Sequence, residues 1–137
     1  NVQLSKIENL ISLNDLSENA ILHNLRIRFK KDAIYTFVST ILISVNPFKP
    51  LPLYTPSVVH KYSHRGSTEL PPHVYALADN AYRGILFDGK DQSLIVSGES
   101  GTGRQRSAQT VVIVLPLESL PAKPEFRLKY GIWSDAV

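Results

Sequence analysis

The chain has 137 residues, of which 43% are hydrophobic and 20% are charged, which suits one globular domain rather than a disordered segment. It contains no cysteine, which excludes disulfides, thiolate metal sites and a catalytic thiol, and its formal net charge of +3 comes without a recognisable nucleic-acid module, so we expect no nucleic-acid binding. No apolar run approaches the roughly 20 residues that cross a bilayer, and no leader-like segment starts the chain, so we expect a cytoplasmic protein without a membrane span.

The first predicted helix follows a capping cluster at residues 14–17. Apolar residues then recur at helical spacing, namely Ile21, Leu22, Leu25 and Phe29. On such a helix Asn24, Arg28 and Lys31 would point away from the apolar side. The pattern therefore predicts an amphipathic helix with these three polar residues off its apolar face.

Two strands are predicted next, at residues 34–38 and 41–45, where β-branched and aromatic residues dominate. The second run is almost continuously apolar, as in a strand that is buried on both faces. Asn46 and Pro47 end this strand, because proline cannot donate to a ladder. Residues 47–56 contain four prolines, which predicts an extended and fairly stiff loop.

Two helices are predicted after this loop, a short one at residues 57–62 and a long one that begins at Pro72. The apolar residues of the long helix keep helical spacing throughout: Val74, Leu77, Ala78, Ala81, Tyr82, Ile85 and Leu86. Its polar residues take the solvent side: Asp79, Asn80 and Arg83. Gly89 is the expected stop signal.

The remaining sequence predicts a short buried-type strand at residues 92–97, a glycine-rich turn at 98–103 and a helix at 104–115. Prolines interrupt the last part of the chain, so residues 116–137 are expected to form an irregular, poorly ordered tail. The expected fold class is α/β, with helices around one or two buried-type strands. The expected domain organisation is one unit at residues 1–115, followed by the tail.

The glycine-rich turn is the main candidate binding site. Its residues match the first six positions of the phosphate-binding loop G-x-x-x-x-G-K-[ST] and lie between a predicted strand and a predicted helix: Gly98, Glu99, Ser100, Gly101, Thr102 and Gly103. In such a loop backbone N–H groups surround phosphate oxygens, and the positive end of the following helix adds to the attraction. A plain strand-to-helix connection is the alternative for these six residues taken alone.

The two positions that complete this loop are altered. Arg104 stands where a lysine normally reaches the outer phosphates, and Gln105 stands where a serine or threonine hydroxyl normally binds magnesium. Arginine keeps the charge but has a bulkier planar fork, and Gln105 offers a neutral carbonyl on a longer stem. Because one charge-assisted contact is worth about 1.5 to 3 kcal/mol, we expect weak phosphate binding, loss of the Mg²⁺ contact and no catalysis.

With these residues in place, the chain resembles the N-terminal part of the myosin motor head, over roughly residues 7–103 without a gap and more weakly up to about residue 115. The blocks that carry the resemblance are specific and come in the family's order: Leu13-Asn14-Asp15, Leu22-His23-Asn24-Leu25-Arg26-Ile27-Arg28-Phe29, Ile34-Tyr35-Thr36-Phe37, Ile41-Leu42-Ile43-Ser44-Val45-Asn46-Pro47-Phe48-Lys49, Pro71-Pro72-His73-Val74-Tyr75-Ala76-Leu77-Ala78 and Gln92-Ser93-Leu94-Ile95-Val96-Ser97-Gly98-Glu99-Ser100-Gly101. The family's Lys-Thr-Glu reads Arg104-Gln105-Arg106 here.

The resemblance implies a fold that is part of a P-loop NTPase and a site for ATP with Mg²⁺. The residues that look like the family's purine-binding loop are Asn46, Pro47, Lys49 and Tyr54. Actin is the implied partner of the intact family, and the implied location is the cytoskeleton. The family's two switch segments and its actin-binding surface lie farther along a much longer head, so the chain by itself is expected neither to hydrolyse ATP nor to move on actin.

Other candidate sites are weaker. His60 and His64 have the i, i+4 spacing of two metal ligands, but no third ligand suggests itself, so no metal site is predicted. Ser100 has no apparent partners for a catalytic triad, so no catalytic residue is predicted. Tyr75 and Tyr82 share a helix and are interpreted as core or rim aromatics.

Two functions of different classes therefore compete. One is the ATP-binding portion of an actin-based cytoskeletal motor with an impaired phosphate loop. The other is a non-catalytic interaction protein of myosin-like shape that holds an anionic partner through Arg104, Arg106 and the basic tail, with binding that is salt-sensitive and indifferent to magnesium. The divergence from Arg104 onward also fits a non-functional truncated product. A P-loop kinase or GTPase is disfavoured because residues 46–54 and 71–82 have no place in one.

Overall fold

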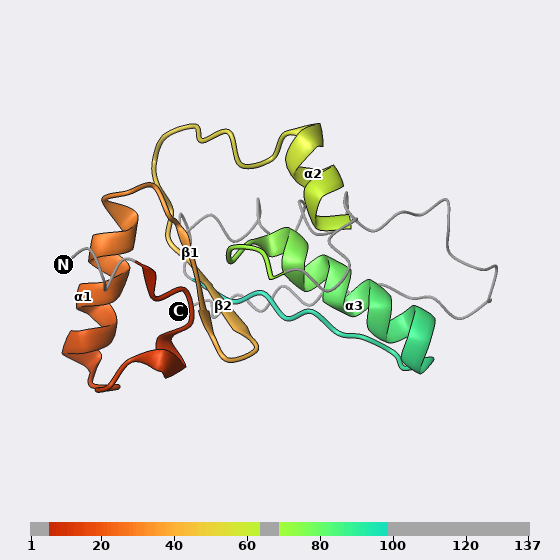
Figure 1. Cartoon of the computed structure of the whole chain (residues 1–137), viewed down its shortest axis with the longest axis horizontal. Coiled ribbons are helices and arrows are strands. Elements are labelled where there is room, and N and C mark those ends of the chain that lie inside the picture. The colour runs from red at the N-terminus through yellow and green to blue at the C-terminus, as the bar shows by residue number, and fades with distance from the viewer. Residues whose placement is uncertain (1–5, 64–68, 99–137) are drawn as a thin grey trace, which may run out of the picture.

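The described part of the chain folds into three α-helices and a two-stranded sheet (Figure 1). The computed structural model describes residues 6–63 and 69–98. Its elements in chain order are the 3-10 turn η2 (Leu10–Ser12), helix α1 (Glu18–Phe29), strands β1 (Tyr35–Val38) and β2 (Ile41–Ser44), and helices α2 (Pro56–Ser63) and α3 (Val74–Asp88). These elements agree with the predicted α/β class. The helix predicted at residues 104–115 and the tail predicted at 116–137 lie outside the described residues.

Helix α1 begins at a well-formed N-terminal cap. The Oγ atom of Ser17 accepts a hydrogen bond from the backbone N–H of Ala20 at 3.4 Å. Asp15 in turn accepts from the hydroxyl of Ser17 at 2.7 Å and from its backbone N–H at 2.9 Å. These two hydrogen bonds hold the pKa of Asp15 below its usual value. The capping cluster predicted at residues 14–17 is confirmed.

The buried side of α1 carries polar residues that the apolar spacing had placed elsewhere. Asn24 is fully buried and Arg28 is 3% exposed, whereas Leu22 is 66% exposed. The prediction that Asn24 and Arg28 point away from the packed side is therefore wrong. Hydrophobic periodicity registers only apolar side chains, whereas a polar side chain is readily buried where the fold supplies hydrogen-bond partners.

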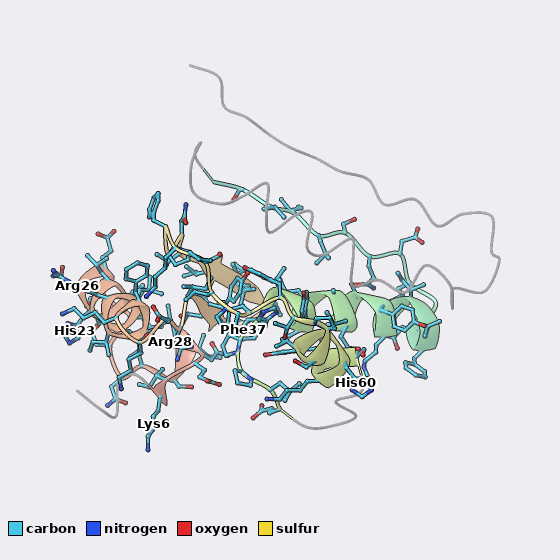
Figure 2. All side chains as sticks on the ribbon, turned by 90° about the horizontal axis from the view of Figure 1, so that it is seen from above. Lys6, His23, Arg26, Arg28, Phe37 and His60 are labelled. Atoms are coloured by element: carbon cyan, nitrogen blue, oxygen red, sulfur yellow. The ribbon has the colours of Figure 1, made fainter. Side chains whose placement is uncertain are left out.

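Arg28 finds these partners in strand β1. Its Nε atom donates to Oγ1 of Thr36 at 2.9 Å, and its second terminal nitrogen donates to the carbonyl oxygen of Tyr35 at 2.9 Å. A longer contact of 3.4 Å reaches the carbonyl oxygen of Ile7. Figure 2 shows Arg28 between α1 and the sheet, whereas Arg26 points outward from the same helix. One guanidinium thus ties α1 to the first strand and to the N-terminal segment.

The sheet is an antiparallel hairpin with its partners in direct register: Tyr35↔Ser44, Thr36↔Ile43, Phe37↔Leu42 and Val38↔Ile41. Ser39 adopts a positive φ of 57° at the turn between the strands. Strand β1 also contacts the N-terminal segment, because the N–H of Phe37 donates to the carbonyl of Glu8 at 2.8 Å. The strands predicted at 34–38 and 41–45 are both confirmed.

The burial predicted for the second strand is wrong within the described residues. Its two ends are exposed and its middle is only partly covered, with Ile41 exposed to 66%. A strand buried on both faces needs neighbouring layers on each side. In residues 6–63 and 69–98, β2 pairs with β1 alone.

The long helix α3 begins two residues later than the sequence predicts. Pro72 lies before the helix, and His73 is the N-cap that accepts from the N–H of Tyr75. Gly89 ends the helix in the left-handed conformation, with φ 61°, as predicted. Asp79 is expected on the solvent side but is buried, and its carboxylate accepts a hydrogen bond from Arg83 one turn later at 2.9 Å.

One hydrophobic cluster joins the hairpin to both later helices. Its buried members are Ile34, Tyr35, Tyr62, Val74, Tyr75, Ala76 and Ala78. Figure 1 shows residues 92–98, drawn in cyan, running back along α3 toward the hairpin, and Leu94 packs against the cluster. No strand pairing forms in this segment within the described part of the chain, contrary to the strand predicted at 92–97, and Ile95 is 85% exposed. No described helix is long and apolar enough to span a membrane.

Candidate functional site

The loop between β2 and α2, residues 45–55, holds the four residues that resemble a purine-binding loop. At its start the side-chain oxygen of Asn46 accepts from the backbone N–H of Phe48 at 2.9 Å, which forms a tight local turn. Phe48 has a positive φ of 50°, and its side chain is 86% exposed. Pro47 lies inside this turn, where its ring restricts the backbone further.

The first half of the loop is anchored to the residues just before and at the start of strand β1. The backbone N–H of Val45 donates to the carbonyl of Ile34 at 3.0 Å, which extends the hairpin by one step. Lys49 forms an ion pair with Asp32, with the nitrogen and oxygen 2.6 Å apart. Both side chains of this pair are about half exposed, so the pair contributes little to stability but does orient Lys49.

The second half of the loop is anchored to the same region of the fold. The hydroxyl groups of Tyr54 and Tyr35 lie 2.7 Å apart and share a hydrogen bond. A tight turn just before Tyr54 is closed by the N–H of Leu53, which donates to the carbonyl of Leu51 at 2.8 Å. Residues 32–35 therefore hold both ends of the loop, through Asp32, Ile34 and Tyr35.

His73 connects the loop to the beginning of α3. Its Nδ1 atom accepts from the backbone N–H of Tyr75 at 3.0 Å, and its Nε2 atom lies 3.0 Å from the carbonyl oxygen of Leu53. An accepting Nδ1 carries no proton, so Nε2 must carry the proton and donate it to Leu53. Burial lowers the pKa of His73 to about 4, opposed by the hydrogen bond to Leu53, so the imidazole is neutral near pH 7.

Four tyrosine rings surround this histidine. The ring centroids of Tyr75, Tyr35, Tyr62 and Tyr54 lie 4.4, 5.0, 5.0 and 5.7 Å from the centroid of His73. The hydroxyl of Tyr62 donates to the carbonyl of Pro71 at 2.6 Å, which fixes the chain just before α3. Burial raises the pKa of Tyr75, and the neighbouring Tyr54 raises it further. Tyr75 is 2% exposed, which confirms its interpretation as a core aromatic.

Of the residues predicted to form the phosphate loop, the structure describes only the first. Gly98 is described, whereas Glu99, Ser100, Gly101, Thr102, Gly103, Arg104 and Gln105 lie outside the described residues. His64 also lies outside them, and His60 is exposed on α2 (Figure 2). In the described ranges no group of three or more His, Cys, Asp or Glu residues could hold a metal ion.

Comparison with known proteins decides the family. The sequence model of the myosin head, described as the motor domain, matches residues 7–120. The chain belongs to the myosin head family. The matched range includes the anchored loop at 45–55, the His73 cluster and the glycine-rich segment that begins at Gly98.

Individual myosins show the same similarity. The high molecular weight form of myosin-1 from Acanthamoeba castellanii is 53% identical over 98 residues, which cover 72% of this chain and 6% of that protein. Unconventional myosin-IXa from Mus musculus is 46% identical over 110 residues, which cover 80% of this chain and 4% of that protein. Myosin-VIIa from Drosophila melanogaster is 44% identical over 106 residues, 77% of this chain and 5% of that protein. The chain thus spans only a small part of the length of these relatives.

Sequence reasoning singled out the loop of this myosin head segment but not the residues that hold it. The sequence pattern assigns no role in the site to Asp32, Tyr35 and His73. For His73 a signal existed, since it stands directly before the periodic run of α3, where a helix needs a side-chain acceptor. Histidine is not among the residues usually preferred at this position, so the signal points to a second task for the side chain.

Proposed function

We propose that this chain supplies the nucleotide-binding portion of an actin-based motor and binds ATP between the loop at 45–55 and the segment at 98–105. The observation that supports this most is the match of the myosin head family to residues 7–120, which includes both segments. The proposal includes the P-loop NTPase architecture, actin as the partner of the assembled motor and a cytoplasmic, cytoskeleton-associated location. It also takes residues 1–115 as the motor segment and 116–137 as a separate tail.

The base of the nucleotide is assigned to Asn46, Pro47, Lys49 and Tyr54. An amide, a ring and an aromatic hydroxyl suit a flat heterocycle with polar edges, because such sites combine apolar surface with a few placed polar groups. The anchors at both ends of the loop support this assignment, since a loop held in one conformation loses little entropy on binding. Lys49 is already oriented by Asp32 and keeps about half of its side chain in solvent.

The phosphates are assigned to Gly98, Glu99, Ser100, Gly101, Thr102 and Gly103, with Arg104 and Gln105 at the two altered positions. Backbone amides of such a loop would still attract phosphate oxygens. Arg104 would deliver its charge through a bulkier group, and Gln105 would lack the hydroxyl that binds Mg²⁺. We infer that ATP binds weakly, that Mg²⁺ adds little and that hydrolysis does not occur.

Titration of a fluorescent ATP analogue, with and without Mg²⁺, tests this function. We expect the wild-type chain to bind ATP weakly and to prefer it over inorganic tripolyphosphate, because only ATP offers a base. The double variant Arg104→Lys with Gln105→Thr should bind about ten- to a hundred-fold more tightly and gain a dependence on Mg²⁺. Arg106→Lys is the matched control, since it keeps the charge and lies outside the two altered positions.

Two results would count against the function. Equal affinities of the wild-type chain for ATP and tripolyphosphate would show that the base adds nothing to binding, which contradicts the proposed base site. Strongly salt-dependent binding that ignores Mg²⁺ in both the wild type and the double variant would favour a non-catalytic interaction protein that holds an anionic partner.

A further inference from the structure

We infer that His73 is a positioning residue for nucleotide recognition, which sets the conformation of the Leu53–Tyr54 backbone and thereby the adenine side of the proposed site. The inference rests on the proposed function and adds to it a residue outside the predicted site. It starts from the two hydrogen bonds of one buried imidazole, one to the loop and one to α3.

The loop contact acts directly on the residue before Tyr54. Nε2 of His73 donates to the carbonyl oxygen of Leu53, and this carbonyl belongs to the peptide group that leads into Tyr54. The ring of Tyr54 is held separately through its hydroxyl, which bonds to Tyr35 at 2.7 Å. One bond therefore fixes the backbone at Tyr54 and another fixes the far end of its ring, so the side chain has a defined direction.

The hydrogen bond from Tyr75 in helix α3 fixes which nitrogen of His73 is the donor. Because Nδ1 accepts the N–H of Tyr75, the proton of the neutral ring is confined to Nε2, where Leu53 receives it. A proton added at Nδ1 would face another N–H group and the positive end of α3, and both oppose it. His73 is 4% exposed and is packed among four tyrosine rings, so the imidazole keeps this orientation.

Two substitutions separate the two contacts. His73→Asn keeps an acceptor near the position of Nδ1 and places a preferred capping residue before α3, but its side chain is too short to reach Leu53 as well. His73→Gln places an amide donor near the position of Nε2 and gives up the cap. The first variant removes the loop contact alone, and the second removes the helix contact alone.

Binding of ATP and inorganic tripolyphosphate to the full chain and to both variants is the first readout. We expect His73→Asn to weaken ATP binding about tenfold, the worth of one hydrogen bond, and to leave tripolyphosphate binding unchanged. His73→Gln should keep the preference for ATP and unfold at a lower temperature. A purely structural role would instead weaken both ligands together, or would lower stability in both variants with the ATP preference intact.

Amide hydrogen exchange is the second readout and requires no nucleotide. We expect His73→Asn to speed exchange at Leu53, whose N–H closes the turn before Tyr54, and His73→Gln to speed exchange at Tyr75. Unchanged exchange at Leu53 in His73→Asn, or an unchanged ratio of ATP to tripolyphosphate affinity in that variant, overturns the inference. If the wild-type chain itself shows no preference for ATP, the proposed function fails first, and the exchange data then report whether the imidazole still sets the loop.

Discussion

The Nε atom of Arg28 donates a hydrogen bond to Oγ1 of Thr36 across 2.9 Å, and both side chains are buried. A charged group inside the fold costs free energy unless its donors are satisfied. Burial lowers the pKa of Arg28, while nearby Glu8 opposes this effect. The direction of the shift shows that desolvation disfavours the charged guanidinium. The contacts to β1 offset that cost.

Arg28→Lys should therefore lower the free energy of unfolding by about 2 to 3 kcal/mol, because lysine keeps the charge but lacks the planar fork that reaches both Thr36 and the carbonyl of Tyr35. Urea unfolding followed by circular dichroism measures this change. Arg26→Lys is the control on the exposed side of the same helix and should change stability by less than about 0.5 kcal/mol. Equal effects of the two substitutions would contradict a special role for the buried guanidinium.

The hydrogen bond between Tyr35 and Tyr54 can be weighed with a double-mutant cycle. Tyr35→Phe and Tyr54→Phe each remove one hydroxyl from the pair, and each should cost about 1 kcal/mol of unfolding free energy. Because both substitutions break the same bond, the double variant should cost less than the sum, by about 0.5 to 1.5 kcal/mol. Urea unfolding measures the three free energies. If the effects of the two single substitutions simply add in the double variant, the two hydroxyl groups do not interact.

Stability should rise with pH between about 4 and 6.5 because of His73. Its pKa is about 4 in the folded chain and 6.5 for an ordinary histidine, so in this range the unfolded state binds more protons than the folded state. The contribution is complete above the unfolded pKa and is lost as the pH falls toward the folded pKa, with a slope of at most about 1.4 kcal/mol per pH unit. The difference in unfolding free energy between the wild type and His73→Asn should show this slope. A difference that does not change with pH over this range would contradict the prediction.

Substitution by alanine should change stability in opposite directions at two glycines, Gly84 within α3 and Gly89 at its C-terminal cap. Gly89 adopts φ 61° at the end of the helix with open space around it, so Gly89→Ala should cost about 1 to 2 kcal/mol through backbone strain alone. Gly84 is an ordinary helical residue, and a Cβ there would meet the flexible end of the Gln92 side chain at 2.6 Å. Gln92 can move aside, so Gly84→Ala should raise stability by up to about 1 kcal/mol through helix propensity. Thermal unfolding of the two variants gives the sign of each change in stability. A large loss of stability in Gly84→Ala would show that the Gln92 side chain cannot move aside.

Elements governed by local rules were predictable from the sequence. The cap at Ser17, the hairpin strands around Ser39 and the stop at Gly89 follow from short-range preferences, and the structure confirms each of them. The proline-rich loop was also predictable as a stiff connection, because proline restricts its own backbone and that of the residue before it.

Features that depend on distant partners were not predictable in this way. Arg28 is buried because strand β1 offers acceptors to its guanidinium, and the sequence of helix α1 carries no trace of those partners. The run at 92–97 has the composition of a strand, yet a strand exists only where a neighbouring backbone pairs with it. The role of His73 depends on Leu53, which is 20 residues away in the chain and carries no sequence signal for that contact.

The contacts described around the loop at 45–55 all come from residues between 32 and 75, well before Gly98. A ribosome therefore synthesises every one of these anchors before it reaches the glycine-rich segment, so the conformation of the loop depends on residues that are made first.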